Sequence, residues 1–331
     1  MSFNPLNLLR SRNVPSPCMW PIRRSKPIGV RDGFAIPIFI RNLQYHLTTV
    51  DAYSDGAIDV WGFVDRSLFE GKLRSGWVWP QPPQGATISV HNLGSCACQD
   101  GEWFRDKADI RDTVHEAIRL NNPTMIHLLD MGGSDTEMRD NVRCSKLGLA
   151  DDYPIRRSAD GSGVPGREVP IFAVASGKHV LTRAFVFADG TARIGATGPL
   201  TTVDSVFKDI ASGKLTTTIP NGVRLEVEGL GSFTPQNGSW FVKALERVKE
   251  LRDLVAQLAG KPDAVQVCRE ALQHYESAAS EDNRSRLRET YEAVPEHLRM
   301  YCGDMDSRDG PIKRILYGDS GSGGDVSEVE G

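Results

Sequence analysis

Three residues of this chain are close enough in sequence to do chemistry together: His91, Cys96 and Cys98. Histidine and cysteine are ligands that zinc prefers, and a thiol beside a histidine is also a nucleophilic pair. Zinc sites usually take four such ligands, with cysteines two or more residues apart, so no metal and no other cofactor is expected. One alternative is therefore a hydrolase-type enzyme with a single site formed by His91 and either cysteine.

Two pairs of adjacent arginines are a second candidate, because a guanidinium binds carboxylate or phosphate through two parallel hydrogen bonds. The pentapeptide Pro-Ile-Arg-Arg-Ser occurs twice and supplies Arg23, Arg24, Arg156 and Arg157. On a strand, adjacent side chains point to opposite faces, so at most one arginine of each pair can reach a given ligand. Ion pairing within the fold is the favoured role, and anion binding is the alternative.

A shorter echo of this motif lies near the C-terminus, at Pro311-Ile312-Lys313-Arg314. An acid precedes both the echo and the second pentapeptide, at Asp309 and Asp152, and each is expected to pair with the bases that follow it. We interpret the echo as a strand that completes the second domain or the contact between domains. A fragment of a lost third repeat is the alternative.

Two histidines and two aspartates also recur, as His46 with His179 and Asp55 with Asp189. A catalytic pair that was duplicated with its fold would show this pattern. A structural role is favoured, in which each aspartate forms a turn and each histidine lies at the start of a strand and bonds the backbone.

The tryptophans Trp61, Trp77 and Trp79 gather in the first half of the chain only. Opposite Trp77 and Trp79, the second half has Lys214 and Thr216. An apolar surface that only one half possesses suits an inter-domain contact, a partner site or the wall of a ligand site.

These residues belong to a sequence that is written twice. Between 75–104 and 212–241, a shift of 137 residues, 12 of 30 positions carry the same residue. The shift is 134 at the two Asp-Gly pairs and 133 at the recurring histidines and pentapeptides. Such a drift is expected when loops of different length separate elements of one duplicated domain.

Each copy predicts the order strand, hairpin strand, helix, strand, strand, helix, because an Asp-Gly turn separates two strand-like runs and a glycine ends the first helix. The expected hairpin strands and helices are 46–53, 57–63, 66–75 and 105–121 in the first copy, 180–187, 191–196, 203–212 and 240–258 in the second, and the further helices 263–279 and 283–294. The fold class is therefore α+β, a tandem duplication in which each domain has a mostly antiparallel sheet with helices on one face.

Three regions follow from this pattern. Residues 15–150 are expected to form the first unit with its linker, 151–317 the second unit with extra C-terminal helices, and 318–331 a disordered acidic tail. The six cysteines do not occupy matching positions, which favours reduced thiols and a cytoplasmic protein. No apolar run is long enough to span a membrane.

The charge distribution bears on nucleic-acid binding. The first 31 residues hold six bases and no acid, yet the formal net charge of the whole chain is −4. Nucleic-acid association through the basic N-terminal arm is thus only a weaker alternative, because a nucleic-acid-binding domain is usually basic.

The residues that the copies share are mostly glycine, proline and hydrophobic, so the sequence favours a non-enzymatic interaction or scaffold protein. The expected partner is another protein, bound where the copies differ, at Trp77, Trp79, His91 and the linker 122–153. Self-association is compatible with this hypothesis.

Overall fold

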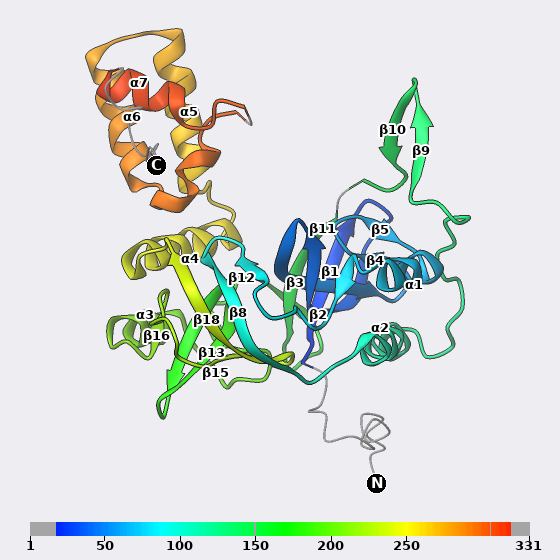
Figure 1. Ribbon diagram of the computed structural model, residues 1–331. Helices are drawn as coiled ribbons and strands as arrows, with labels where there is room; N and C mark the ends of the chain where they lie inside the picture. Colours follow the sequence, from blue (N-terminus) through cyan, green and yellow to red (C-terminus); the bar gives the residue numbers. More distant parts are fainter. Residues whose placement is uncertain (1–17, 149, 305, 319–331) are drawn as a thin grey trace, which may run out of the picture. The chain divides into compact units, whose positions relative to one another are not determined.

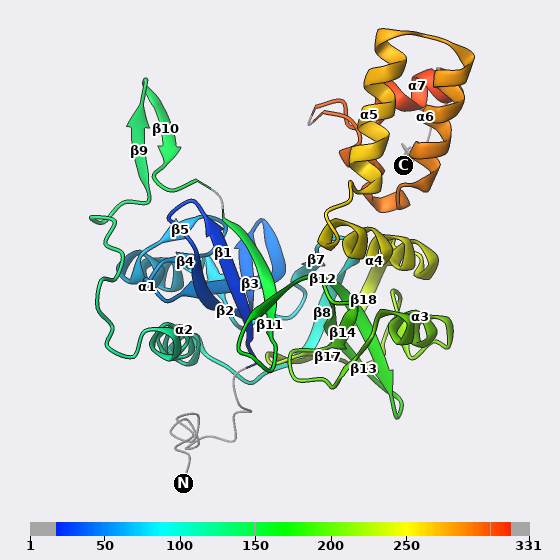
Figure 2. The same cartoon turned by 180° about the vertical axis from the view of Figure 1, so that it is seen from behind.

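The computed structural model describes residues 18–148, 150–304 and 306–318. The basic arm up to residue 17 and the acidic tail from residue 319 lie outside the described residues, and so do the expectations placed on them. The chain divides into two compact units, the first ending at Phe241 and the second beginning at Val242. The division does not fall near residue 150, because both copies contribute strands to one sheet (Figures 1 and 2).

The first copy contains the predicted elements in the predicted order, together with three strands that this order did not include, Trp20–Lys26, Arg31–Asn42 and Gly94–Trp103. Its strands and helices are β1 (Trp20–Lys26), β2 (Arg31–Asn42), β3 (Gln44–Tyr53), β4 (Ile58–Asp59), β5 (Phe63–Val64), α1 (Arg66–Ser75), β6 (Val78–Trp79), β7 (Thr87–Val90), β8 (Gly94–Trp103) and α2 (Lys107–Asn121). A hairpin of β9 (Thr136–Arg139) and β10 (Val142–Ser145) lies in the linker between the copies.

The second copy repeats this order. Its elements are β11 (Asp151–Arg157), β12 (Gly163–Ala175), β13 (Lys178–Phe187), β14 (Thr191–Ile194), β15 (Leu200–Thr202), α3 (Val203–Ala211), β16 (Leu215–Thr216), β17 (Leu225–Val227), β18 (Gly231–Trp240) and α4 (Ala244–Leu258). The chain continues with α5 (Ala264–Ser277), α6 (Glu281–Ala293), the 3₁₀ helix η2 (Glu296–Tyr301) and α7 (Gly310–Tyr317).

Ten strands of the first unit form a closed ring of pairings. Its order is β1-β2-β3-β7-β8-β18-β17-β13-β12-β11 and back to β1. Each copy supplies five consecutive strands, and the copies meet twice, at β8–β18 and at β1–β11. The expectation of a separate sheet in each domain is therefore wrong: one sheet closes on itself and encloses a shared interior.

The β8–β18 joint has twofold pseudosymmetry. Gly94 lies opposite Trp240, and Gly231, the residue equivalent to Gly94, lies opposite Trp103. A Cβ atom on Gly94 would lie 2.3 Å from the carbonyl oxygen of Ser239, and one on Gly231 would lie 2.3 Å from that of Glu102. The repeated Leu-Gly-Ser triplet is thus explained, because only glycine lets the two backbones approach this closely.

Alternating residues of the strands face the ring interior or the helices. On β2, Ile36, Ile38 and Ile40 pack outward against a core that includes residues of α1 and α2. On the inward face, Trp20, Ala35 and other apolar residues of the first copy pack with aromatic residues of β13. The two faces follow from the two-residue period of a strand.

The register corrects an equivalence that sequence identity suggested, that of His46 with His179. Ile40 lies opposite His46 in the β2–β3 hairpin, whereas the matching residue of β12, Ala173, lies opposite Val180 rather than His179. The extra residue of the second copy thus lies in the hairpin turn itself. A slip of one position moves a side chain to the other face of the strand, so the two histidines are not equivalent.

The C-terminal echo of the pentapeptide forms helix α7 and not the expected strand. Pro311 lies in the first turn, where its fixed φ suits a helix and its missing N–H is not needed. Ile312 and Leu316, four residues apart, pack into a core shared with α5 and α6. Asp309 accepts a hydrogen bond from Tyr291 Oη at 2.5 Å and lies 3.2 Å from Lys313 Nζ.

Candidate functional site

A cavity of about 220 Å³ lies within the ring, between strands of both copies. The residues that line it are Trp20, Pro37, Leu47, Thr48, Thr49, Val90, His91, Glu168, Pro170, Leu181, Thr182, Arg183, Val227 and Glu228. These come from β1, β2, β3 and β7 on one side and from β12, β13 and β17 on the other, with His91 and Glu228 directly after β7 and β17.

Most of the lining consists of equivalent residues from the two copies. The matched pairs are Pro37 with Pro170, Leu47 with Leu181, Thr48 with Thr182, and Val90 with Val227. The cavity therefore lies on the pseudo-twofold axis that relates the copies. Its apolar frame was duplicated with the fold.

The charged groups of the cavity occur where the copies differ. Arg183 occupies the position of Thr49, because both lie opposite the matched prolines. Glu228 occupies the position of His91, one residue beyond the matched valines. Glu168 corresponds to Ala35, which carries no polar group.

Glu168 and Arg183 form the central contact of the cavity. Arg183 Nε donates a hydrogen bond to Glu168 Oε1 at 2.6 Å, and its guanidinium lies 4.9 Å from the ring centroid of Trp20. The second carboxylate oxygen, Glu168 Oε2, is buried and has no hydrogen-bond partner among the described residues. A buried acceptor without a donor is unfavourable, so the site has an unmet hydrogen-bonding capacity.

Glu228 is held more completely. Its Oε1 accepts a hydrogen bond from the backbone N–H of Ala196 at 2.8 Å, and its Oε2 accepts one from the hydroxyl of Thr182. Cys18 lies close to this carboxylate, and burial, reinforced by Glu228, raises the pKa of the Cys18 thiol to about 12. Glu228 is thus fixed in place at the wall of the cavity.

Further acids face the ring interior beyond the cavity. Tyr53 Oη donates a hydrogen bond to Asp152 Oδ2 at 2.6 Å, which joins β3 to β11. Asp51 lies two residues before Tyr53 on the same face, and Asp59 lies opposite Asp51 in the β3–β4 pair. Burial, together with the carboxylates of Asp152 and Asp59, raises the pKa of Asp51 well above its usual value.

The same negative surroundings act on Glu168. Burial raises its pKa, the guanidinium of Arg183 opposes this, and the carboxylates of Asp152 and Glu228 raise it further. The interior therefore holds more acid than base close to the cavity, and it disfavours an additional negative charge.

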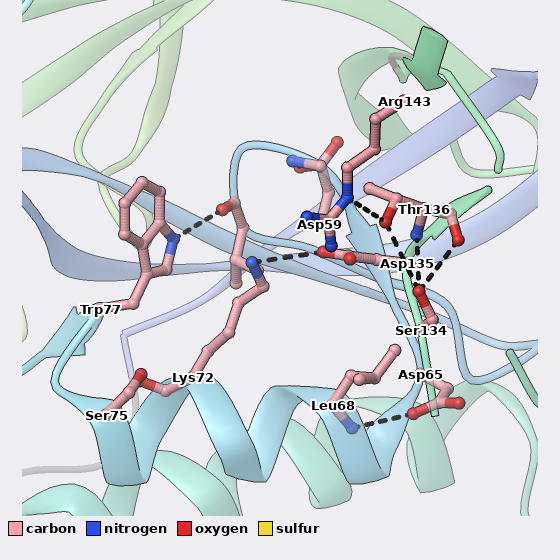
Figure 3. A network of polar contacts seen from close by, with 12 residues as sticks. Asp59, Asp65, Leu68, Lys72, Ser75, Trp77, Ser134, Asp135, Thr136 and Arg143 are labelled. Carbon is pink, nitrogen blue, oxygen red and sulfur yellow. Dashed lines mark hydrogen bonds and ion pairs between the residues drawn. The ribbon is translucent and has the colours of Figure 1, made fainter. Parts of the chain in front are cut away.

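Among the residues that the sequence singled out for binding, His91 alone is in the cavity lining. Trp77 lies outside the ring, near α1, where its Nε1 donates to Val60 O at 3.1 Å and Lys72 Nζ lies 5.3 Å from its ring centroid. Lys72 also reaches Asp135 of the linker at 3.5 Å, as Figure 3 shows. Trp79 donates to Gln81 O at 2.7 Å and lies 4.3 Å from Lys107 Nζ.

The four arginines form ion pairs within the first unit. Arg23 and Arg157 both bind Asp32, at 2.7 and 2.8 Å, so this pair of contacts joins the copies. Arg24 binds Asp55 at 2.6 Å, and Arg156 binds Asp189, the equivalent aspartate. Asp152 is not the partner of these arginines, because it lies against Tyr53.

The two pentapeptides are displaced by one residue in the structure. Arg24 and Arg156, which do not match in sequence, both bind the Asp-Gly aspartate of their own copy. They also lie over equivalent rings, 4.6 Å from Tyr53 and 5.9 Å from Phe187. All four arginines thus form ion pairs within the fold, which was the favoured role. Their partners are Asp32, Asp55 and Asp189, whereas the expected partner was Asp152.

The geometry does not give Cys96 or Cys98 the character of a nucleophile. Both are buried on β8, and burial raises the pKa of Cys96 to about 12 and that of Cys98 to about 11. A thiolate at neutral pH requires the opposite shift. Among the described residues, no group of three or more histidine, cysteine, aspartate or glutamate side chains is arranged to hold a metal ion.

The recurring histidines have different surroundings. His46 lies 3.2 Å from the carbonyl oxygen of Asn42 through Nε2, and its ring centroid is 4.9 Å from that of Trp61. His179 Nδ1 is buried and has no hydrogen-bond partner in the described part of the chain. The backbone contact expected of both residues is present for His46.

Sequence reasoning missed Trp20, Glu168 and Arg183, although their types are suited to ligand binding. Glu168 and Arg183 correspond to Ala35 and Thr49 of the first copy, so a sequence comparison that looks for identical residues passes over them. A comparison of hairpin registers that looks for differences between inward-facing positions would have found both.

Comparison with known proteins agrees with the duplication and leaves the activity open. Residues 24–125 and 154–262 each match one family, described as a domain of unknown function (DUF7638), and residues 263–330 match a second domain of unknown function (DUF7639). No curated protein and no solved structure matches the chain. Among the described residues, no helix is both long and apolar enough to cross a membrane. Because the two DUF7638 matches together cover more than half of its residues, the chain belongs to the DUF7638 family and carries this domain twice.

Proposed function

We propose that this protein binds a small polar organic molecule in the cavity inside the ring. The proposal rests mainly on Glu168, which lines a cavity of about 220 Å³ and whose buried Oε2 has no hydrogen-bond partner among the described residues. Natural interiors seldom leave such an acceptor unsatisfied, and a ligand that donates a hydrogen bond would satisfy it.

The size of the cavity limits the ligand. A volume of 220 Å³ corresponds to roughly seven water molecules at their liquid density. Pockets for drug-sized ligands are larger, at about 300–1,000 Å³. A metabolite of roughly ten non-hydrogen atoms or fewer is therefore the size class that fits.

The polar groups are held before any ligand arrives, which lowers the entropy that binding must overcome. Arg183 is fixed by Glu168 and by the face of Trp20, and Glu228 is fixed by two donors. The apolar pairs Leu47 with Leu181 and Val90 with Val227 surround these groups. An apolar frame with a few fixed polar groups is the usual composition of a small-molecule site.

A panel of small metabolites, screened by thermal shift with the full chain, tests this proposal. A ligand of the cavity should raise the melting temperature of the natural protein and not that of Thr49→Leu, in which the added carbon atoms occupy the cavity. Thr124→Leu, the same change at an exposed linker position, is the matched control and should retain the response. A shift of equal size in Thr49→Leu would place binding elsewhere, and no response to any compound would contradict the proposal.

A protein partner outside the ring is a second candidate, and Trp61 favours it. This side chain is 47% exposed, and its backbone has φ of +66°, a conformation that bulky residues rarely adopt. The equivalent residue of the second copy is Gly195, with φ of +76°. A strained, exposed tryptophan where the other copy has glycine suits a contact surface that only the first copy possesses.

A further inference from the structure

Resting on the proposed function, we infer that the cavity selects a small primary amine, whose ammonium group binds Glu168 Oε2. The proposal concerns the charge of the ligand, which the size of the cavity leaves open. Its basis is the arrangement of acids and bases around Glu168 Oε2, which has no hydrogen-bond partner among the described residues.

Glutamates outnumber arginines among the residues that line the cavity. Glu168 and Glu228 supply two carboxylates, and Arg183 is the single arginine among the lining residues. Arg183 is already engaged through Nε with Glu168 Oε1. Apart from His91, the titratable side chains of the lining are therefore two acids and one base, and a ligand with one positive charge would balance them.

Acidic residues near the cavity, outside its lining, also favour a positively charged ligand. Asp152 lies near enough to Glu168 to influence its ionisation, and Asp51 and Asp59 lie near Asp152. Arg24, a base that acts on the ionisation of Asp59, is bound to Asp55 at 2.6 Å. A carboxylate ligand would therefore add to the carboxylates that already raise the pKa of Glu168, whereas a cation would favour the ionised form of Glu168.

An ammonium group also fits the hydrogen-bonding requirement. Glu168 Oε2 needs a donor, and a primary ammonium offers three and accepts none. A hydrogen bond between two charged groups is about twice as strong as a neutral one. The cavity also has room for a short apolar body, because its volume is about 220 Å³ and leucine and valine residues of both copies line it.

Three probes of nearly equal size separate the charge classes: butylamine, 1-butanol and butyrate, titrated into the full chain at neutral pH and low salt. The expected result is that butylamine binds at least about tenfold more tightly than 1-butanol and that butyrate binds weakest. Glu168→Gln keeps the shape of the side chain and removes its charge, so it should abolish the preference for the amine. Glu289→Gln, at an exposed position of α6, is the matched control and should retain it.

Thr49→Leu provides a second test that does not depend on the folding of Glu168→Gln, because it closes the cavity and keeps every charge. It should weaken the binding of butylamine and 1-butanol alike. Equal or tighter binding of 1-butanol or butyrate, blocked by Thr49→Leu, would overturn the amine assignment and leave the cavity as a binding site. Binding of none of the three probes would overturn the amine assignment, and a metabolite panel that also gave no response would remove the proposed function.

Discussion

Arg183 Nε lies 2.6 Å from Glu168 Oε1, on adjacent strands whose counterparts in the other copy place Thr49 and Ala35 at the same positions. The two copies therefore share a symmetric frame, and the ion pair occurs on one side of it only. Because both side chains are mostly buried, each depends on the other for compensation of its charge.

Removing one partner of this pair should be worse than removing both. Arg183→Met leaves Glu168 buried beside other carboxylates, and we expect it to lower the free energy of unfolding by about 2 kcal/mol. The double variant Glu168→Gln/Arg183→Met should lose less than the single one. Urea unfolding of the four proteins of this cycle provides the measurement, and additive losses would show that the two side chains act independently.

Ring closure can be tested at Gly94. An added Cβ would lie 2.3 Å from the carbonyl oxygen of Ser239, so Gly94→Ala should cost at least about 3 kcal/mol and open the β8–β18 joint. Gly85→Ala is the matched control, because Gly85 also has positive φ and nothing lies within 4 Å of its added Cβ. It should cost only about 1 kcal/mol. Equal losses in chemical denaturation would contradict the close approach of the two copies.

Because Trp61 has a strained backbone conformation, the usual stability order of a glycine and an alanine substitution should be reversed at this position. At an ordinary position glycine is less stable than alanine by about 0.5–1 kcal/mol. With φ of +66°, Trp61→Gly should instead be more stable than Trp61→Ala by about 1 kcal/mol. Thermal unfolding of the two variants measures the difference, and the ordinary order would mean that residue 61 does not adopt this backbone conformation.

Asp51 should make stability depend on pH. The pKa of Asp51 is raised in the folded protein, so folding favours its protonated form. The resulting stabilisation is fully present below the ordinary aspartate pKa of about 4 and is lost as the pH rises through the folded pKa. Asp51→Asn removes this loss. We therefore expect it to stabilise the protein by about 1 kcal/mol or more at pH 8 and to have little effect near pH 4. Urea unfolding across this range would disagree if the benefit grew toward acid.

Part of the order of elements within each copy could be predicted from the sequence, because glycines and Asp-Gly turns are local signals, but the predicted order did not include β1, β2 and β8 or their counterparts β11, β12 and β18. Asp65 and Thr202 cap α1 and α3, and the side chain of each accepts a hydrogen bond from the backbone N–H of the residue three positions later. The one-residue displacement of the pentapeptides could not be predicted, since identity of sequence favoured the opposite pairing of arginines. The pairing of β1 with β2 and of β11 with β12 shows that Arg24 corresponds to Arg156.

Ring closure and the cavity depend on contacts that no local pattern encodes. Gly94 meets Trp240 across a long stretch of chain, and either residue alone is compatible with an ordinary edge strand. Glu168 and Arg183 likewise become neighbours only when β12 and β13 pair. The sequence therefore identified His91 as a residue that differs between the copies, without the groups that share its cavity.

Methyl NMR of the full chain tests the central claim most directly. Leu47, Leu181, Val90 and Val227 line the cavity, whereas Ile36 and Ile38 pack on the outer side of the same sheet. On titration with butylamine, we predict chemical-shift changes and intermolecular NOEs at the four leucine and valine residues, with the two isoleucines unchanged. Shifts at the isoleucines with none at the cavity residues would contradict a ligand site inside the ring.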